Sequence, residues 1–152
     1  MPRTASRPRT LQLSVIGRDK FAGLPARSTL RRWVQMALQH DAQLSLVFVD
    51  SSAGRRLNRE FRGRDYATNV LTFAYARKPQ VAADIVLCTP VLRREAHQGK
   101  RSLRSHVAHL VIHGVLHAQG FDHESRREAL AMQTREQQLL ARLRISDPYA
   151  DQ

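Results

Sequence analysis

The sequence predicts one α/β (α+β) domain in which helices cover a small mixed β-sheet. The chain has 152 residues, the length of a single domain with a core of its own. Its 42% of apolar and 25% of charged residues are ordinary for a globular protein and exclude wholesale disorder. Short segments patterned like strands stand among longer segments of helical periodicity. Some of these strands are adjacent in the sequence, which favours a mixed sheet.

The first predicted elements are a strand, a helix and a second strand. Leu11 to Val15 alternates between apolar and polar residues, as a half-buried strand does. Pro25 suits a first helical turn. The apolar residues that follow it recur at helical spacing, namely Leu30, Trp33, Val34, Ala37 and Leu38. The second strand is predicted from Leu44 to Val49.

The middle of the chain predicts a short helix, a loop and two strands. Ser51 or Ser52 can cap a helix that continues through Phe61. The polar segment from Arg62 to Asn69 is predicted to be a loop. Two strands are then expected, from Val70 to Tyr75 and from Asp84 to Cys88.

The last third of the chain is predicted to be helical. Thr89-Pro90, a cap residue followed by proline, opens one helix. Ser102 is predicted to start a long central helix that Gly120 ends. Ser125-Arg126-Arg127-Glu128 is a capping box for the final helix. The apolar face of that helix consists of Met132, Leu139, Leu140 and Leu143.

The ends of the chain and its cysteine content suggest a cytoplasmic protein. Residues 1–10 are basic and contain no acid, so we predict a flexible tail there, one domain over 11–146 and a second tail over 147–152. No apolar run is long enough to span a bilayer, and the N-terminus lacks the apolar stretch of a secretory signal. Cys88 is the one cysteine and lies in an apolar run, which predicts a core thiol in a reducing compartment.

The formal net charge of +12 is the strongest signal in the composition. A field of this sign concentrates polyanions at the surface, so RNA, DNA, a ribosome or an anionic membrane surface are all compatible partners. Of the 25 basic residues, 22 are arginine. Solubility in an arginine-rich proteome is therefore an alternative explanation that charge alone does not exclude.

The segment from His109 to His123 predicts a metal site. On a helix, residues four apart lie one above the other, so His113 and His117 share a face. One turn rises about 5.4 Å, a separation that two imidazoles can close to share a metal at about 2.0–2.1 Å. Gly120 can take the left-handed conformation that ends a helix, and the turn would bring His123 back to the same ion. Three histidines leave one coordination position open for water, as in catalytic zinc sites.

The alternative is that these histidines are ordinary core residues in an apolar helix. Burying an imidazole without a partner costs about 1–3 kcal/mol, so several histidines at ligand spacing favour a metal. A metal held by His109, His113 and His117 would need ligands spread over about 12 Å of helix axis, and we exclude that triad. His109 is instead predicted to orient a ligand, as is Asp122. His40 is predicted to be a surface residue.

The spacing matches the His-Glu-x-x-His-x-x-Gly-x-x-His pattern of metzincin proteases at every position except the second, which is Gly114. In those proteases the glutamate is the general base, and glycine can take no proton, so peptide hydrolysis is disfavoured. A phosphodiester instead needs cationic stabilisation of its transition state, which a metal and an arginine can supply. Arg62, at a predicted helix end, is the candidate arginine. The alternative is a solvated arginine on a basic loop.

These motifs resemble those of the YbeY family of metal-dependent endoribonucleases, which are bacterial rRNA maturation factors. The resemblance extends from about Leu44 to Leu143. It rests on Leu57-Asn58, Phe61-Arg-Gly-Arg-Asp65, Thr68-Asn-Val-Leu-Thr-Phe73, Ala83-Asp-Ile85 and His113 to His123. The chain departs from the family pattern where tyrosine, proline or glycine is usual, at Phe61, Phe121, Ala67 and Ala83.

The resemblance implies a mixed α/β domain of the zinc-hydrolase type, with one zinc ion held by three histidines of the central helix and its turn: His113, His117 and His123. It also implies a catalytic Arg62, and we expect Arg64 and Asn69 to bind substrate beside it. The implied activity is cleavage of single-stranded RNA in 16S rRNA 3′-end maturation and ribosome quality control. The expected partners are RNA and the ribosome or its small subunit, with no membrane and no DNA.

Two other functions stay open at this point. One is a zinc peptidase or amidase that takes its base from elsewhere, such as Asp84 or Asp122. The missing helix glutamate argues against it. The other is a non-enzymatic ribosome-binding factor in which the metal only stabilises the fold. An open coordination position argues against that function.

Overall fold

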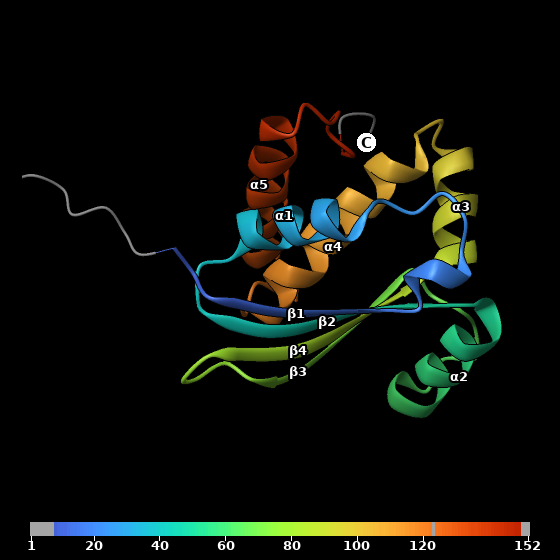
Figure 1. Cartoon of the computed structure of the whole chain (residues 1–152), viewed down its shortest axis with the longest axis horizontal. Coiled ribbons are helices and arrows are strands. Elements are labelled where there is room, and N and C mark those ends of the chain that lie inside the picture. The colour runs from blue at the N-terminus through green and yellow to red at the C-terminus, as the bar shows by residue number, and fades with distance from the viewer. Residues whose placement is uncertain (1–7, 123, 150–152) are drawn as a thin grey trace, which may run out of the picture.

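The computed structural model describes residues 8–122 and 124–149 of the chain. Its base is a four-stranded sheet with the strand order β1-β2-β4-β3 (Figure 1). Strands β1, β2 and β4 run parallel, whereas β3 runs antiparallel to β4, so the sheet is mixed as predicted. The strands are β1 (Leu11–Ile16), β2 (Ala42–Val49), β3 (Val70–Ala76) and β4 (Val81–Cys88).

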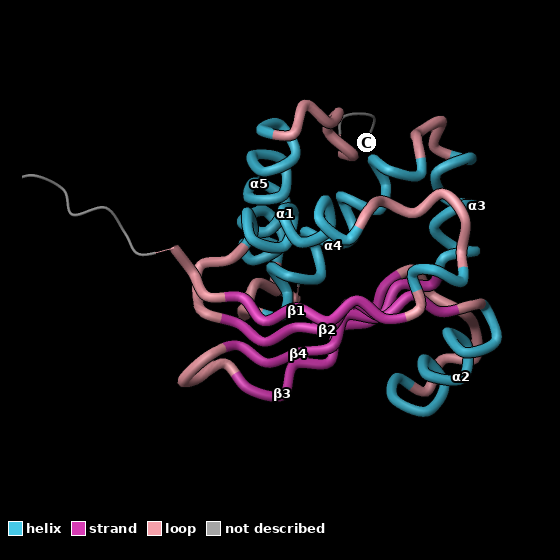
Figure 2. Tube along the Cα trace, in the orientation of Figure 1, coloured by secondary structure: helices cyan, strands magenta, loops and turns pink. Residues whose placement is uncertain are grey.

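Most of the helices gather on one side of the sheet, as the tube view shows (Figure 2). Helix α4 contacts β3, β4, α1, α3 and α5, which is the central place that the sequence predicted for it. None of the described helices combines the length and the apolarity that crossing a membrane requires. The helical elements are η1 (Arg18–Lys20), α1 (Arg27–Ala37), α2 (Ser51–Arg62), α3 (Thr89–Gln98), α4 (Leu103–Ala118) and α5 (Arg126–Arg142).

Neighbouring residues of β4 distinguish the two faces of the sheet. Side chains alternate between the faces along a strand. Ile85 packs against Gly114 of α4, and Cys88 packs against Gly54 of α2. Because positions 85 and 88 point to opposite faces, α4 and α2 lie on opposite sides of the sheet. Asp84, next to Ile85, therefore lies on the α2 face and away from α4.

The apolar helix α4 supplies much of the core. Nine of its residues are buried, and they lie all around the helix, as expected for an element enclosed by a sheet and three other helices. The predicted burial of Cys88 is confirmed, and this burial raises the pKa of its thiol. The predicted fold class is confirmed.

The helix caps differ from the prediction in two places. Asp50, not a serine, caps α2, because its carboxylate accepts a hydrogen bond from the Ala53 N–H at 2.8 Å. Aspartate and serine cap helices about equally well, so residue type alone does not show which of the neighbouring positions is the cap. Thr89 is not a cap but the first residue of α3, and it is buried. Ser102 and Ser125 cap α4 and α5 as predicted.

Candidate metal centre

Three histidines follow one another along a single face of α4, and each is partly buried. The ring centroids of His109 and His113 are 6.3 Å apart, and the rings are nearly perpendicular. The rings of His113 and His117 are 6.5 Å apart and nearly parallel, with an interplanar angle of 11°. The predicted arrangement of His113 and His117 on one face is confirmed. The three side chains are partly exposed on a helix whose other residues are largely buried, so their face opens toward solvent.

The Nδ1 atoms of His113 and His117 are both engaged by hydrogen-bond acceptors. Nδ1 of His113 lies 2.5 Å from Oε1 of Glu136. Nδ1 of His117 lies 3.0 Å from the carbonyl oxygen of Phe121. A carboxylate and a carbonyl only accept, so in the neutral rings the proton is on Nδ1 and Nε2 is the atom with a lone pair that could bind a metal. Metal-bound histidines usually have this second hydrogen bond. The two side chains therefore fit a metal site.

The turn after α4 has the shape that the sequence predicted. Gly120 has a φ of 110°, which favours glycine, and its N–H donates to the carbonyl of His117 at 3.0 Å. The N–H of Phe121 donates to the carbonyl of Leu116 at 3.1 Å. The third predicted ligand, His123, lies outside the described residues. Asp122 is half-buried directly before it.

Gly114 replaces the protease glutamate for a steric reason. A Cβ atom placed on Gly114 would lie 2.7 Å from Cγ2 of Ile85 on β4, closer than real Cβ contacts come. The position faces the sheet, and the absent side chain lets α4 approach β4 closely. A glutamate there would have to push the helix away from the sheet. The structure thus gives the helix no room for a base at this position.

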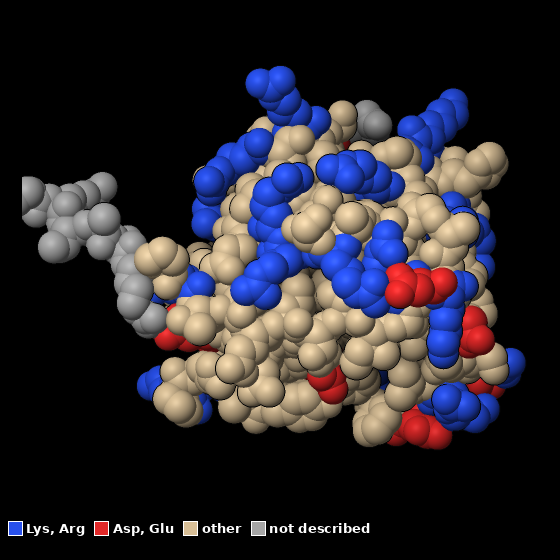
Figure 3. All heavy atoms as spheres, viewed as in Figure 1, with Lys and Arg blue, Asp and Glu red and all other residues tan. Residues whose placement is uncertain are grey.

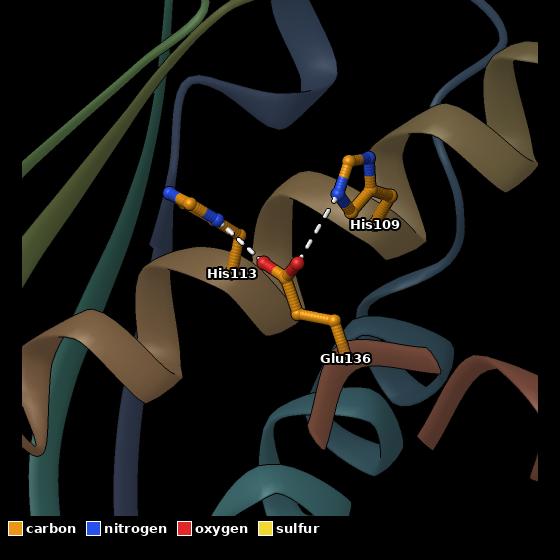
Figure 4. Close-up of side chains that lie close together, drawn as sticks. All are labelled: His109, His113 and Glu136. Atoms are coloured by element: carbon orange, nitrogen blue, oxygen red, sulfur yellow. Dashed lines mark hydrogen bonds and ion pairs between the residues drawn. The ribbon is translucent and has the colours of Figure 1, made fainter. Parts of the chain in front are cut away.

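A buried carboxylate on α5 completes the cluster, and the sequence analysis did not identify it. Glu136 is fully buried, and its two oxygens point toward the histidines of α4 (Figure 4). Oε2 accepts a hydrogen bond from the hydroxyl of Tyr149 at 2.5 Å. Nε2 of His109 lies 3.8 Å from the same oxygen and 3.3 Å from that hydroxyl. Four side chains from two helices and the C-terminal segment thus form one network: His109, His113, Glu136 and Tyr149.

The charge of Glu136 follows from this network. Burial raises the pKa of its carboxyl group, but the interactions with His109, His113 and Tyr149 outweigh burial and bring the pKa to about 2. Burial of Tyr149 itself, together with the neighbouring Glu136 carboxylate, raises the pKa of the Tyr149 hydroxyl. The carboxyl group is therefore ionised at neutral pH, and the tyrosine remains a donor.

The positions of His109 and Glu136 also allow a second way to hold a metal. His109, His113 and Glu136 offer ligand atoms that all lie within 4.8 Å of one another, so this group could hold a metal ion. The sequence prediction instead paired His113 with His117 and gave His109 an orienting role. Both arrangements use His113, but through different ring nitrogens, because Glu136 faces Nδ1 of this residue.

The predicted substrate-binding residues lie on and after α2. Arg62 ends this helix, Gly63 follows in the left-handed region with a φ of 69°, and the predicted helix end is confirmed. Among the described residues, exposed Arg62 has no hydrogen-bond or ion-pair partner. Arg64 Nη1 donates to the Tyr66 hydroxyl at 3.3 Å. Nδ2 of Asn69 donates to Glu95 of α3 at 3.1 Å, which fixes the loop where β3 begins.

One further arginine lies beside the histidine turn. Arg77 directly follows β3 and is exposed. The Cζ atom of its guanidinium lies 3.7 Å from the position of a Cβ atom on Gly120. The sequence does not predict this contact, because nothing in the local pattern relates the end of β3 to the end of α4.

Comparisons with known proteins agree with this architecture. The family model described as "Endoribonuclease YbeY" matches residues 19–144. A protein of that name from Cupriavidus metallidurans is 50% identical over 151 residues, which cover 96% of this chain and 77% of the relative. Another from Methylibium petroleiphilum is 47% identical over 150 residues, covering 99% of this chain and 100% of the relative.

The fold also has a counterpart among solved structures. The solution structure of TM1509 from Thermotoga maritima matches with a TM-score of 0.56 at 23% sequence identity. The match covers 91% of this chain and 99% of that protein, and it supports the fold alone. The family model and the relatives at about half identity decide the family. The chain belongs to the YbeY endoribonuclease family.

Proposed function

We propose that this protein is a zinc-dependent, single-strand-specific endoribonuclease that acts in 16S rRNA 3′-end maturation and ribosome quality control in the cytoplasm. The observation that carries the proposal is the pair His113 and His117, stacked on α4 with both Nδ1 atoms engaged. This geometry prepares both Nε2 atoms as metal ligands. Relatives of the chain are named as endoribonucleases, which supports RNA as the substrate.

Three histidines are proposed to hold one zinc ion, namely His113, His117 and His123. A zinc ion held there would supply a Lewis acid that polarises a phosphoryl oxygen of the RNA. The guanidinium of Arg62 is proposed to pair with the phosphoryl oxygens, most strongly as negative charge grows in the transition state. Arg64 and Asn69 are proposed to bind the RNA beside it, and His109 and Asp122 to orient the ligands.

The surface charge supports an RNA partner, with the small ribosomal subunit as its source. The chain has a formal net charge of +12. On the face of the molecule in Figure 3, basic side chains are spread over the helical half and acidic ones are few. Several arginines of α1 and α4 are exposed, namely Arg27, Arg31, Arg32 and Arg104. Such a surface binds phosphates through the release of condensed counterions.

The structure weakens the competing peptidase function. A base at position 114 is excluded by the contact of α4 with Ile85. Asp84, one of the two candidate bases named above, lies on the face of the sheet opposite α4, whereas the other, Asp122, follows the histidine turn. Oδ2 of Asp84 accepts a hydrogen bond from the Tyr75 hydroxyl at 2.6 Å. Its carboxylate is therefore already engaged by a neighbouring strand.

A cleavage assay with end-labelled RNA tests the proposal. Zinc-loaded protein should cleave a single-stranded RNA and leave the same sequence intact within a duplex. Treatment with a chelator should abolish cleavage, and added zinc should restore it. Cleavage of a peptide substrate in place of RNA would overturn the proposal, and RNA binding without cleavage would leave the ribosome-binding function.

A further inference from the structure

We infer that Glu136 is a positioning residue for the metal ligand His113 and that Tyr149 holds its carboxylate in place. The inference rests on the metal site proposed above. It assigns a role in metal binding to α5 and to the C-terminal segment, which contain none of the proposed ligands.

The first observation is that a charged residue occupies a core position. Glu136 is fully buried on α5 in line with Met132, Leu139 and Leu140, where an apolar side chain would fit the stripe. Burying a carboxylate carries a large desolvation cost, which hydrogen-bond partners must offset. Packing alone therefore does not account for a carboxylate at this position, and its polar partners do.

The second observation is the contact with His113. Oε1 of Glu136 lies 2.5 Å from Nδ1 of the ring. This contact fixes the rotation of the ring and keeps the proton on Nδ1, so Nε2, on the other side of the ring, is the ligating atom. The negative charge also makes the ring a stronger donor to a metal. His117 is oriented by a neutral carbonyl instead. The two proposed ligands are thus held by partners of different charge.

The third observation concerns the other oxygen of the carboxylate. Oε2 accepts from the Tyr149 hydroxyl at 2.5 Å, so Oε1 stays directed at His113. The segment that contains Tyr149 is itself attached to α5. Gln137 donates to Asp147 at 3.0 Å, and the N–H of Tyr149 donates to the same carboxylate at 2.8 Å. The tyrosine ring also packs edge-on against His109, with 5.6 Å between the centroids.

A rival arrangement makes Glu136 a ligand together with His109 and His113. That arrangement requires His113 to bind through Nδ1. The observed contacts favour the positioning role, because the 2.5 Å between Nδ1 of His113 and Oε1 of Glu136 is too short for two ligands of one metal ion. The two arrangements predict different ring nitrogens on the metal and a different importance of His109.

Zinc affinity, measured by competition with a chromophoric chelator, separates these arrangements. Glu136→Gln should lower zinc affinity about 10- to 100-fold, the range found when a partner of a metal-bound histidine is lost. Tyr149→Phe should lower it less, because the contact with His113 persists. His109→Gln should lower it less than Glu136→Gln does, because Nε2 of His109 lies 3.8 Å from the carboxylate. The control Glu60→Gln, on the exposed face of α2, should leave it unchanged. An equal loss in His109→Gln and Glu136→Gln would make Glu136 a ligand and overturn the inference.

Two further measurements keep the test independent of folding and of activity. Circular dichroism of the metal-free Glu136→Gln variant should show the parental fold, so its loss of zinc affinity is not a loss of structure. Nitrogen NMR of the histidine rings in zinc-loaded parent protein should show His113 protonated at Nδ1, whereas zinc on Nδ1 would overturn the inference. Unchanged affinity in Glu136→Gln would overturn it as well. If His117→Ala also retains full affinity, the proposed metal site fails with it.

Discussion

The histidine face of α4 and the loop that follows α2 differ in how firmly the fold holds their functional side chains. His113 and His117 are anchored through Nδ1 and flanked by buried residues of α4. Arg62 is exposed and, within the described part of the chain, has no hydrogen-bond or ion-pair partner. The comparison indicates that the fold itself holds the proposed metal ligands in place. We expect the side chain of Arg62 to become ordered when a phosphate supplies its partner.

The largest expected effect comes from replacing one of the histidines that hydrogen bonds hold in place on α4. His117→Ala removes one of the proposed ligands together with its anchored ring, so zinc content should fall from about one ion per chain to nearly none. The matched control is His40→Ala, because His40 is exposed and lies before β2. Elemental analysis of the two purified variants checks this. Equal zinc content in both would contradict the assignment of His117.

The second effect belongs to the loosely held arginine. Arg62→Lys retains the charge but loses the planar fork that can meet two phosphoryl oxygens. We expect RNA affinity and zinc content close to those of the parent, with cleavage slower by about 10²-fold, the order found when one preorganised donor is lost.

Two other arginines serve as controls for this experiment. Arg59→Lys, three positions earlier on α2, should cleave at the parental rate. Arg77→Lys tests whether the guanidinium beside Gly120 acts instead. A parental rate in Arg62→Lys together with slow cleavage in Arg77→Lys would move the catalytic role to the end of β3. Single-turnover rates at saturating protein provide the comparison.

The salt dependence of RNA affinity tests the same difference between the exposed arginines and the anchored histidines. Arginines that pair with phosphates displace condensed counterions from the RNA, whereas metal ligands do not. With about four phosphate contacts to a single strand, RNA affinity should fall roughly 50-fold between about 50 and 200 mM salt. Arg64→Ala should reduce the slope of log affinity against log salt by about 0.7. His117→Ala should leave that slope unchanged, and a flat response of the parent protein would argue against RNA as the partner.

The smallest expected effect comes from Glu95, which holds the loop before β3 through its hydrogen bond with Asn69. Glu95 accepts hydrogen bonds from His106 at 2.9 Å and from Asn69 at 3.1 Å. These hydrogen bonds, that of His106 foremost, lower the pKa of its carboxyl group below the usual value for glutamate. A depressed carboxyl pKa stabilises the fold above the unfolded pKa, and the contribution disappears as the pH falls through the folded pKa.

Glu95→Gln should therefore unfold at lower urea concentration than the parent near neutral pH, and the difference should shrink under acid conditions. Solvent reaches about a third of the Glu95 side chain (35%), so we expect less than about 1 kcal/mol. Glu60→Gln, fully exposed on α2, is the control. A difference that grows as the pH falls would contradict the assigned direction of the pKa.

Local patterns predicted the parts of the site that lie close together in the sequence. The spacing of His113 and His117 and the turn at Gly120 follow from helical geometry within one segment, and the structure has both. The cap of α2 was wrong by one or two positions, because aspartate and serine cap almost equally well. Strand β4 begins at Val81, earlier than its apolar run suggested, because it pairs with β2 from Ala42 onward.

Long-range partners could not be predicted in this way. Glu136 lies 23 positions after His113, and only the packing of α5 on α4 brings them together. A signal was nevertheless present, since an acidic residue interrupts the apolar stripe of the last helix. The sequence did not predict the contact of Tyr149 with Glu136, because Tyr149 lies in a segment that was predicted to be only a tail. The contact of Arg77 with Gly120 likewise depends on where β3 ends in the sheet.

The central claim is that the anchored histidines of α4 hold the metal that RNA cleavage requires. The most direct measurement is the cleavage rate of a labelled single-stranded RNA by parent protein and by His117→Ala, each after chelator treatment and after readdition of zinc. We predict that zinc restores cleavage to the parent and not to the variant, while both bind the RNA equally well. Equal cleavage by His117→Ala, or by chelator-treated parent protein, would contradict the account.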